Sequence, residues 1–448
     1  MTKNSNNLLK LLGVSFGIAV TVGGTLGTGI LRKPGPIAEL IGDPVLIMTL
    51  WLLVGIYAFL GVLCVIELAV SLPKAGSWYV YARRAFGDYF GFITGITSWL
   101  GTVAALGFGA YTMGEYLAIL FPFLSNFEQL TSTLLILLLM LFHWTGTKSA
   151  GKSQEILALI KAVGLLIFVA ACFLYRPQES IAVANELKSP DNLSGSAGIV
   201  GIIAALQAIF YTYDGWHTAS YFSEENTDPA KTLPKSMILG VLGIIVIYLL
   251  VNGAILYVLP MDQLAGSKLA AADAVKLIFG EGSSRIVTAF LLISILGIVN
   301  AQIMFAPRVI YSMGRDGLFL KSLITVNKWG TPAVAMPLTG MLSIALIMSG
   351  KNTCGILSDI ATFFFVLSYS AGFAALIRLR YKEPDLPRPY KAPLFPYIPL
   401  LMVLVSMLFL TGAVYSDLNS SKFALIFILI SFPLYKIVSA LNRKKHNV

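Results

Sequence analysis

Charged residues are scarce in this sequence. Asp, Glu, Lys and Arg make up 12% of the 448 residues, whereas a soluble globular domain has about 25%. Hydrophilic stretches are also short, and the longest lie at about 176–196, 260–284 and 378–396. None of them is long enough to form a separate catalytic domain. With 57% hydrophobic residues, the composition excludes an ordinary soluble protein.

Cysteine and histidine are rare too, with three of each. An odd number of cysteines, scattered in and beside apolar blocks, gives no disulfide framework. The histidines do not have the spacing of metal ligands; they are His143, His217 and His446. The sequence also has no recognisable pairing of a nucleophile with a base. We therefore expect no enzyme activity, no metal and no cofactor.

The net charge of +10 would suit a nucleic acid, but its distribution does not. Basic residues lie in short loops between apolar blocks, and they do not form one patch interleaved with aromatic residues. We therefore expect no nucleic-acid partner.

Long apolar blocks dominate what is present. Blocks of about 18 or more residues with few charges are typical of membrane-spanning helices. The predicted spans are 11–41, 44–72, 88–121, 130–147, 154–175, 197–223, 235–259, 285–313, 332–349, 355–377, 397–416 and 422–441. The sequence therefore predicts an all-α polytopic membrane protein with twelve transmembrane helices, surrounded by the lipid bilayer.

Lys and Arg are unevenly divided between the two sides of these spans. The termini and the loops that follow even-numbered spans hold 21 of the 32, and the opposite loops hold 9. Because cytoplasmic loops are enriched in Lys and Arg, we expect both termini in the cytoplasm and the protein in the plasma or inner membrane. The N-terminus has no small-residue cleavage site, so the first block is expected to be retained as a helix.

Two spans are interrupted by residues that are poor in helices. The first has four glycines within residues 23–29, and each costs about 1 kcal/mol relative to Ala. The sixth contains Asp-Gly-Trp-His at residues 214–217. Freed backbone groups cannot bond to water inside a bilayer, so such breaks persist where they line a cavity or bind a ligand. Close helix packing through Gly23 and Gly27 is the alternative explanation for the glycines.

The positions of these breaks favour a transporter. They open two successive groups of five spans, and unwound segments at corresponding positions of two halves mark a transporter's binding site. The half-helix after a break offers free N–H groups and a positive dipole end to a carboxylate. Carbonyl groups freed before the break can accept hydrogen bonds from an ammonium group. A site with both features suits the backbone of an amino acid.

Ordered motifs along the chain resemble the amino acid–polyamine–organocation superfamily and, within it, bacterial-type members of the L-type amino acid transporter subfamily. The matching segments are Gly27-Thr28-Gly29-Ile30, residues 211–216 with Glu224-Glu225 and 228–234, residues 307–317, and residues 388–396. The resemblance implies a LeuT-type fold, in which two inverted five-helix repeats and two extra helices give alternating access to a midplane site. Residues 1–176 and 196–380 would form the repeats, and 397–441 the extra helices, within one transmembrane domain.

The resemblance also implies roles for individual residues. The implied substrate-binding residues are Thr25, Gly27, Thr28, Gly29, Tyr211 and Asp214. Gly27, Thr28 and Gly29 would donate main-chain N–H groups to the substrate carboxylate. The carbonyl oxygens of Thr25, Tyr211 and Asp214 would accept hydrogen bonds from its ammonium group. Tyr211 or Trp216 would act as a gate over the site.

Lys161 stands alone in an apolar helix, about 10 Å from its cytoplasmic end at 1.5 Å per residue. Its side chain could extend to the interface. An intramembrane charge is nevertheless a functional-site hypothesis by default, since burial costs at least ~2.5 kcal/mol. Family members have a lysine here, where the ammonium replaces a bound sodium ion between the first, fifth and eighth helices. We therefore expect transport that does not depend on sodium.

These observations favour a sodium-independent exchanger of neutral L-amino acids that requires no accessory subunit. A proton-coupled amino acid symporter and a transporter of cationic amino acids or polyamines are the alternatives. A polyamine has no carboxylate, so it would leave the N–H groups of residues 27–29 without a partner. An ion channel would favour rings of like charge or a repeated carbonyl filter, whereas the two breaks are dissimilar and occur once each.

Four smaller features have structural interpretations. Residues 146–153 satisfy a phosphate-binding-loop pattern, but they join two membrane helices without the strand that the motif needs. We expect Glu67 to pair with an interfacial residue such as Lys74. The arginines at 83–84 are expected to anchor an inside loop, with an inner-gate contact as the alternative. Asn192 begins a glycosylation pattern that has meaning only in a eukaryotic secretory setting.

Overall fold

The computed structural model describes residues 7–175, 196–416 and 418–444, so the pattern at Asn192 lies outside the described residues. The described chain is nearly all helical, with 82% helix and no strand. The helices are α1 (Val14–Thr25), α2 (Gly29–Arg32), α3 (Pro34–Ile41), α4 (Pro44–Ser71), α5 (Trp78–Phe86), α6 (Asp88–Leu120), η1 (Pro122–Leu124), α7 (Glu128–Trp144), α8 (Thr147–Leu174), α10 (Ser196–Tyr213), η3 (Thr218–Glu225), α11 (Pro229–Val258), α12 (Met261–Ala265), α13 (Ala270–Phe279), η4 (Glu281–Ser283), α14 (Ser284–Arg315), η5 (Lys321–Ile324), α15 (Ala335–Met348), α16 (Lys351–Lys382), α17 (Tyr397–Ser416) and α18 (Leu418–Lys444).

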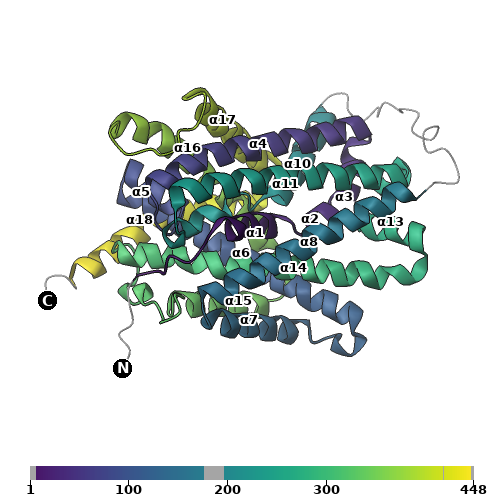
Figure 1. Ribbon diagram of the computed structural model, residues 1–448, viewed down its shortest axis with the longest axis horizontal. Coiled ribbons are helices and arrows are strands. Elements are labelled where there is room, and N and C mark those ends of the chain that lie inside the picture. The colour runs from purple at the N-terminus through teal and green to yellow at the C-terminus, as the bar shows by residue number, and fades with distance from the viewer. Residues whose placement is uncertain (1–6, 176–195, 417, 445–448) are drawn as a thin grey trace.

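The long helices run roughly parallel to one another, and α1 lies at the centre of the bundle (Figure 1). Ten helical stretches among the described residues are long and apolar enough to cross a membrane. Two shorter apolar helices, α7 and α15, lie where the fourth and ninth spans are predicted. The predicted all-α polytopic class is confirmed, and the count of twelve crossings stays a prediction.

The outer helices present apolar side chains outwards. Leu138 on α7, Leu159 on α8, Leu408 on α17 and Leu429 on α18 are each more than 60% exposed. A soluble monomer rarely shows apolar surface of this extent. The inner helices α4 and α6 are instead mostly buried. This distribution fits a bundle whose outer face contacts lipid.

Loops that the charge distribution assigns to one side of the membrane meet at one end of the bundle. The Thr227 N–H donates to the carbonyl oxygen of Leu12 at 3.0 Å, which joins the N-terminal segment to the loop before α11. Arg84, at the end of α5, pairs with Glu383, which follows α16, at 2.9 Å. We refer to this as the terminal end of the bundle.

The predicted partner of Glu67 is wrong. Its buried carboxylate pairs with Arg380 at 2.5 Å and Arg388 at 3.3 Å, and it accepts the Ala392 N–H at 2.6 Å. Lys74 is near Glu67 in the sequence, but the end of α4 packs against α16 and the segment after it. The arginine-rich segment around residue 380 therefore neutralises a buried acid, in addition to its predicted role in orientation.

Both predicted helix breaks are confirmed. The first helix stops at Thr25 and resumes at Gly29, and the intervening backbone turns extended at Leu26. The other break follows Tyr213, where α10 ends. Gly215 then has φ +108°, a left-handed conformation that favours glycine. The chain continues into η3, a 3₁₀ helix of eight residues.

The two breaks contact each other. A Cβ atom added to Gly215 would lie 2.6 Å from the Gly24 carbonyl oxygen and 2.9 Å from Thr25 Oγ1. The Tyr248 hydroxyl lies 2.8 Å from the carbonyl oxygens of both Thr25 and Thr212, so its single proton is shared between the two breaks. Helix ends that would otherwise have free carbonyls thus have a common donor.

We predict that Gly215→Ala destabilises the protein, because it adds a Cβ atom against Gly24 and places Ala in a conformation that costs at least ~1–2 kcal/mol. Gly243→Ala is the matched control, since a Cβ there meets nothing within 4 Å. The measurement is the apparent melting temperature of each purified variant in detergent. A fall of several degrees is expected for Gly215→Ala alone. Equal melting temperatures for the two variants would contradict the assigned contact.

Candidate functional site

The gap between α1 and α2 leaves main-chain N–H groups without helical partners. The last turn of α1 closes where the Leu26 N–H donates to the Val22 carbonyl oxygen at 2.8 Å. Within the described residues, the N–H groups of Gly27, Thr28 and Gly29 donate to no main-chain carbonyl. Consecutive free N–H groups at a helix start carry the positive end of the helix dipole and bind anions. This gap can therefore hold a carboxylate.

Lys161 crosses the same gap from α8. Its fully buried ammonium donates to the carbonyl oxygens of Gly23 at 2.8 Å and Leu26 at 2.7 Å. On its other side lies Gly297 of α14, where an added Cβ would come within 2.5 Å of the lysine Cε. Lys161 thus lies between α1, α8 and α14. Carbonyl oxygens freed at a broken membrane helix can also coordinate Na⁺, and here two of them accept hydrogen bonds from the Lys161 ammonium.

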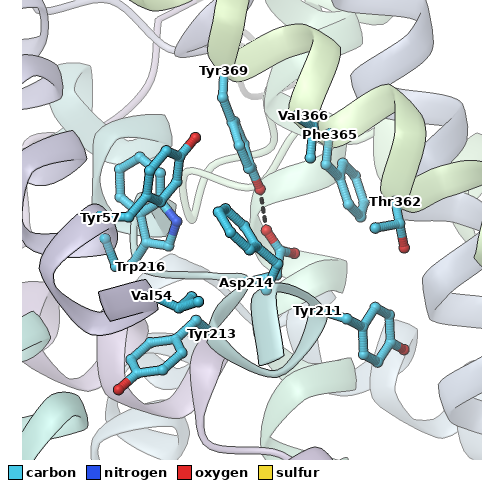
Figure 2. A pocket seen from close by; sticks show the side chains of 12 residues that line it. Val54, Tyr57, Tyr211, Tyr213, Asp214, Trp216, Thr362, Phe365, Val366 and Tyr369 are labelled. Atoms are coloured by element: carbon cyan, nitrogen blue, oxygen red, sulfur yellow. Dashed lines mark hydrogen bonds between the residues drawn. The ribbon is translucent and has the colours of Figure 1, made fainter. Parts of the chain in front are cut away.

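A first pocket, with about 370 Å³ of space, lies beside the second break. Its walls come from α4 (Val54, Tyr57, Ala58), from the end of α10 (Phe210, Tyr211, Tyr213), from the break (Asp214, Trp216) and from α16 (Thr362, Phe365, Val366, Tyr369). Figure 2 shows the Tyr369 hydroxyl directed at the Asp214 carboxylate, with the Tyr211 ring turned away from that pair. This pocket is mainly aromatic, and Asp214 provides its charge.

A second pocket, with about 360 Å³ of space, lies between the two breaks, α6, α14 and α16. Gly24 and Gly215 form the wall from the breaks, Thr102 comes from α6, and Gln302 comes from α14. Asp214 and Phe365 line both pockets. The second pocket is the one that adjoins the end of α1, and its lining is more polar than that of the first.

Asp214, Tyr369 and His217 form a hydrogen-bonded series. The Tyr369 hydroxyl donates to the Asp214 carboxylate and lies 2.9 Å from His217 Nε2. His217 Nε2 is also 3.7 Å from the same carboxylate. The His217 ring is buried, whereas the Asp214 side chain is 31% exposed. A mid-membrane acid that lines both pockets is available to a cationic group of a ligand.

Aromatic side chains close the pockets towards the terminal end. The Trp78 ring lies 6.1 Å from Trp216, 5.4 Å from His217 and 5.9 Å from Phe373. Trp78 and Trp216 are both almost completely buried. Tyr211, on the other side of the break, is 38% exposed. The structure is therefore closed towards the terminal end.

Polar contacts continue this closure. The Ser77 and Ser220 hydroxyls lie 2.6 Å apart, and Arg83 pairs with Asp316 at 2.7 Å. Burial, together with the negative charge of Asp316, raises the pKa of Tyr79. This tyrosine therefore stays protonated, and its hydroxyl donates a hydrogen bond to the Asp316 carboxylate at 2.9 Å. The arginine at 83 thus makes an inter-loop contact of the kind that the gate alternative requires.

Deeper in this end, two ion pairs join η3 to α14. Glu225 and Arg308 pair with both side chains buried. Glu224 pairs with Arg315 at 2.7 Å. Breaking a buried pair leaves an uncompensated charge, which costs about 3–5 kcal/mol. These pairs therefore hold η3 against α14 at this end of the bundle.

The sequence-predicted residues fall into two groups in space. Thr25, Gly27, Thr28 and Gly29 lie at the first break, and none of them lines either pocket. Tyr211, Asp214 and Trp216 line the first pocket, and Asp214 also lines the second. The Thr25 carbonyl oxygen already accepts from Tyr248, and the Tyr211 carbonyl oxygen accepts the Asp214 N–H at 3.3 Å. Their roles towards a substrate stay predictions.

Several lining residues were not predicted, among them Thr102, Gln302, Phe365 and Tyr369. The available signal was a single polar residue on a helix face. Ile298, Gln302 and Phe305 are spaced four and three residues apart, so they lie on one face of α14. That spacing does not show by itself which face meets a pocket.

Comparisons with known proteins identify the family of this chain. A family profile described as amino acid permease matches residues 10–433. The serine/threonine exchanger SteT of Bacillus subtilis is 27% identical over 443 residues, which cover 97% of this chain and 98% of that protein. The b(0,+)-type amino acid transporter 1 of Mus musculus is 28% identical, with 92% and 84% covered. The large neutral amino acids transporter small subunit 2 of Homo sapiens is 27% identical, with 96% and 80% covered.

The family match spans nearly the whole chain, including both breaks and Lys161. The similar proteins are named as amino acid transporters or exchangers. The chain therefore belongs to the amino acid permease family of the amino acid–polyamine–organocation superfamily, and it is a membrane transporter rather than an enzyme.

Proposed function

We propose that this protein is a sodium-independent exchanger of neutral L-amino acids that works by alternating access. The observation that carries the proposal is the gap at residues 26–28. It offers, on one side, three consecutive N–H groups that donate to no main-chain carbonyl of the described residues, and carbonyl oxygens on the other. A zwitterion needs donors for its carboxylate and acceptors for its ammonium group, a few ångströms apart. An unwound membrane helix supplies both without a charged side chain.

In this proposal, Gly27, Thr28 and Gly29 hold the substrate carboxylate. The carbonyl oxygens of Thr25, Tyr211 and Asp214 accept from its ammonium group. The hydrogen bonds that these carbonyls already accept do not exclude this role, because a carbonyl oxygen has two lone pairs.

Sodium independence is supported by Lys161. Its ammonium already bonds the carbonyl oxygens of Gly23 and Leu26, so the acceptors that a sodium ion would need are occupied. The contact with α14 at Gly297 leaves little space beside it. These two hydrogen bonds would hold the end of the first half-helix in place through each transport cycle.

Alternating access is supported by the aromatic closure towards the terminal end. Residues 1–176 and 196–380 would form two inverted five-helix repeats, with 397–441 as two extra helices and both termini in the cytoplasm. Each proposed repeat has its break in its first helix. Trp216 lies on the closed side of the pockets and Tyr211 on the more exposed side. We assign them to the inner and outer gates respectively.

Exchange is supported by the name of one relative, a serine/threonine exchanger. A second relative is named a small subunit, which implies a partner for that protein. We propose that this chain needs no accessory subunit, since one chain supplies the lining of both pockets. The first is lined by α4, the end of α10 with its break, and α16, and the second by α1, α6, the same break, η3, α14 and α16.

We predict that the purified chain alone, in liposomes, takes up a labelled neutral L-amino acid only when an unlabelled one is inside. Replacing Na⁺ by choline, or imposing a pH gradient, should leave the initial rate unchanged. Uptake that collapses without Na⁺ would overturn the role of Lys161. Uptake into empty liposomes driven by a pH gradient would favour the proton-coupled alternative.

The same assay tests Lys161 directly. Lys161→Ala leaves two buried carbonyls without their donor, at about 1–3 kcal/mol each, so exchange should fall at least about tenfold. Lys152→Ala on the same helix is the matched control, because that side chain is exposed. Size-exclusion profiles establish that both variants are folded. Equal exchange by Lys161→Ala and Lys152→Ala would contradict the assignment.

A cationic substrate is the second candidate, because the Asp214 carboxylate faces both pockets. We predict that neutral L-amino acids raise the melting temperature of the protein, whereas their decarboxylated amines and polyamines do not. The reason is that only the acids have a partner for the N–H groups of residues 27–29. A thermal-shift panel of the twenty amino acids with the matching amines measures this. Stabilisation by the amines, or by Lys and Arg alone, would overturn the proposal of neutral substrates.

A further inference from the structure

The second pocket contains buried polar atoms that have no partner. The amide oxygen of Gln302 and the Nδ1 atom of His217 are both inaccessible to solvent and, within the described residues, hydrogen-bonded to nothing. Both residues line this pocket, and His217 is 4% exposed. An unpaired buried polar group costs free energy comparable to a lost hydrogen bond, and such a group calls for an explanation.

The hydrogen bonds around His217 determine what its free nitrogen can do. The Tyr369 hydroxyl has one proton, which it donates to the Asp214 carboxylate. Its oxygen can therefore only accept from His217 Nε2, 2.9 Å away, so Nε2 carries a hydrogen. In the neutral ring, the Nδ1 atom is then an acceptor with a free lone pair.

Gln302 adds a second acceptor. The donors already present in the pocket are used elsewhere, because Thr102 donates to the Ser98 carbonyl oxygen and Thr218 to that of Gly215. The Tyr221 hydroxyl is paired with Ser98 Oγ. The pocket therefore has two free acceptors, while its own hydroxyl groups have partners.

We propose that this pocket is the side-chain subsite, and that it selects neutral amino acids whose side chain donates a hydrogen bond. A hydroxyl or a primary amide, as in serine, threonine or asparagine, supplies the donor that Gln302 and His217 lack. The proposal rests on the proposed function, since Gly24 and Gly215 connect this pocket to the break that would hold the substrate backbone. Gln302 and His217 are specificity-determining residues in this assignment.

Threonine and valine are the sharpest pair of probes, because they have the same shape and differ by a hydroxyl in place of a methyl group. A site built to hydrogen-bond a substrate group discriminates strongly against an analogue that lacks it, because its own buried polar atoms then stay unpaired. We expect unlabelled threonine to inhibit exchange at a concentration at least about tenfold lower than valine does. Each ratio is internal to one preparation, so it does not depend on the amount of active protein.

Gln302→Met keeps the length of the side chain and removes the acceptor. The threonine-to-valine ratio should then fall at least about threefold, with His217 left as the remaining acceptor. Gln129→Met is the matched control, since Gln129 lies on α7, where its amide contacts the Ile347 carbonyl oxygen, and lines neither pocket. The ratio should be unchanged in that variant.

Three outcomes separate the two proposals. Exchange of amino acids with equal inhibition by threonine and valine in the unmodified protein overturns the side-chain subsite, because water then satisfies both acceptors. An equal ratio in Gln302→Met and Gln129→Met overturns the assignment of Gln302. Absence of exchange for every neutral amino acid overturns the proposed function itself.

Discussion

The structure depends on how backbone groups that leave a helix inside a membrane are satisfied. Two helices stop near the middle of the bundle, and no lipid can replace the hydrogen bonds that they lose. The protein supplies fixed partners. Lys161 bonds the carbonyl oxygens of Gly23 and Leu26, and the Tyr248 hydroxyl bonds those of Thr25 and Thr212. Carbonyls are satisfied in this way, whereas the N–H groups of residues 27–29 donate to no main-chain carbonyl in the described part of the chain.

This asymmetry connects the fold to the chemistry of transport. Donors left free at one break can hold an anionic group only while the surrounding helices keep water and lipid out. The bundle achieves this with apolar outer helices and with pockets that lie between inner helices. The terminal end is closed by other interactions, namely contacts among the aromatic rings around Trp78 and the ion pairs of Glu224 and Glu225. In the proposed transport cycle, the rings would exclude water and the paired charges would exchange partners when that end opens.

Local features of the sequence were sufficient to predict the helices and both breaks. Clustered glycine, an Asp-Gly pair and a solitary lysine each have a direct local meaning in an apolar span, and the structure has a break or a buried cation at each of them. Residues whose meaning depends on a distant partner were not predictable in this way. Glu67 meets Arg380, more than 300 positions later, so a nearby lysine was the wrong choice. Gln302 is one polar residue on a long helix. Only the packing of α6 and η3 around it buries its amide oxygen without a hydrogen-bond partner among the described residues.

The hydrogen bonds between the N-terminal segment and η3 have a mechanical consequence. The N–H groups of Leu11 and Leu12 donate to the Glu225 carbonyl oxygen at 2.9 and 3.0 Å. At the other end of the same two segments, α1 and η3, Gly24 packs against Gly215. α1 and η3, which are the halves of the two broken helices nearer the terminal end, therefore contact each other at both ends. A tilt of one would move the other with it, so that the two would move as a rigid unit. The hinges would be the short non-helical stretches at residues 26–28 and 214–217.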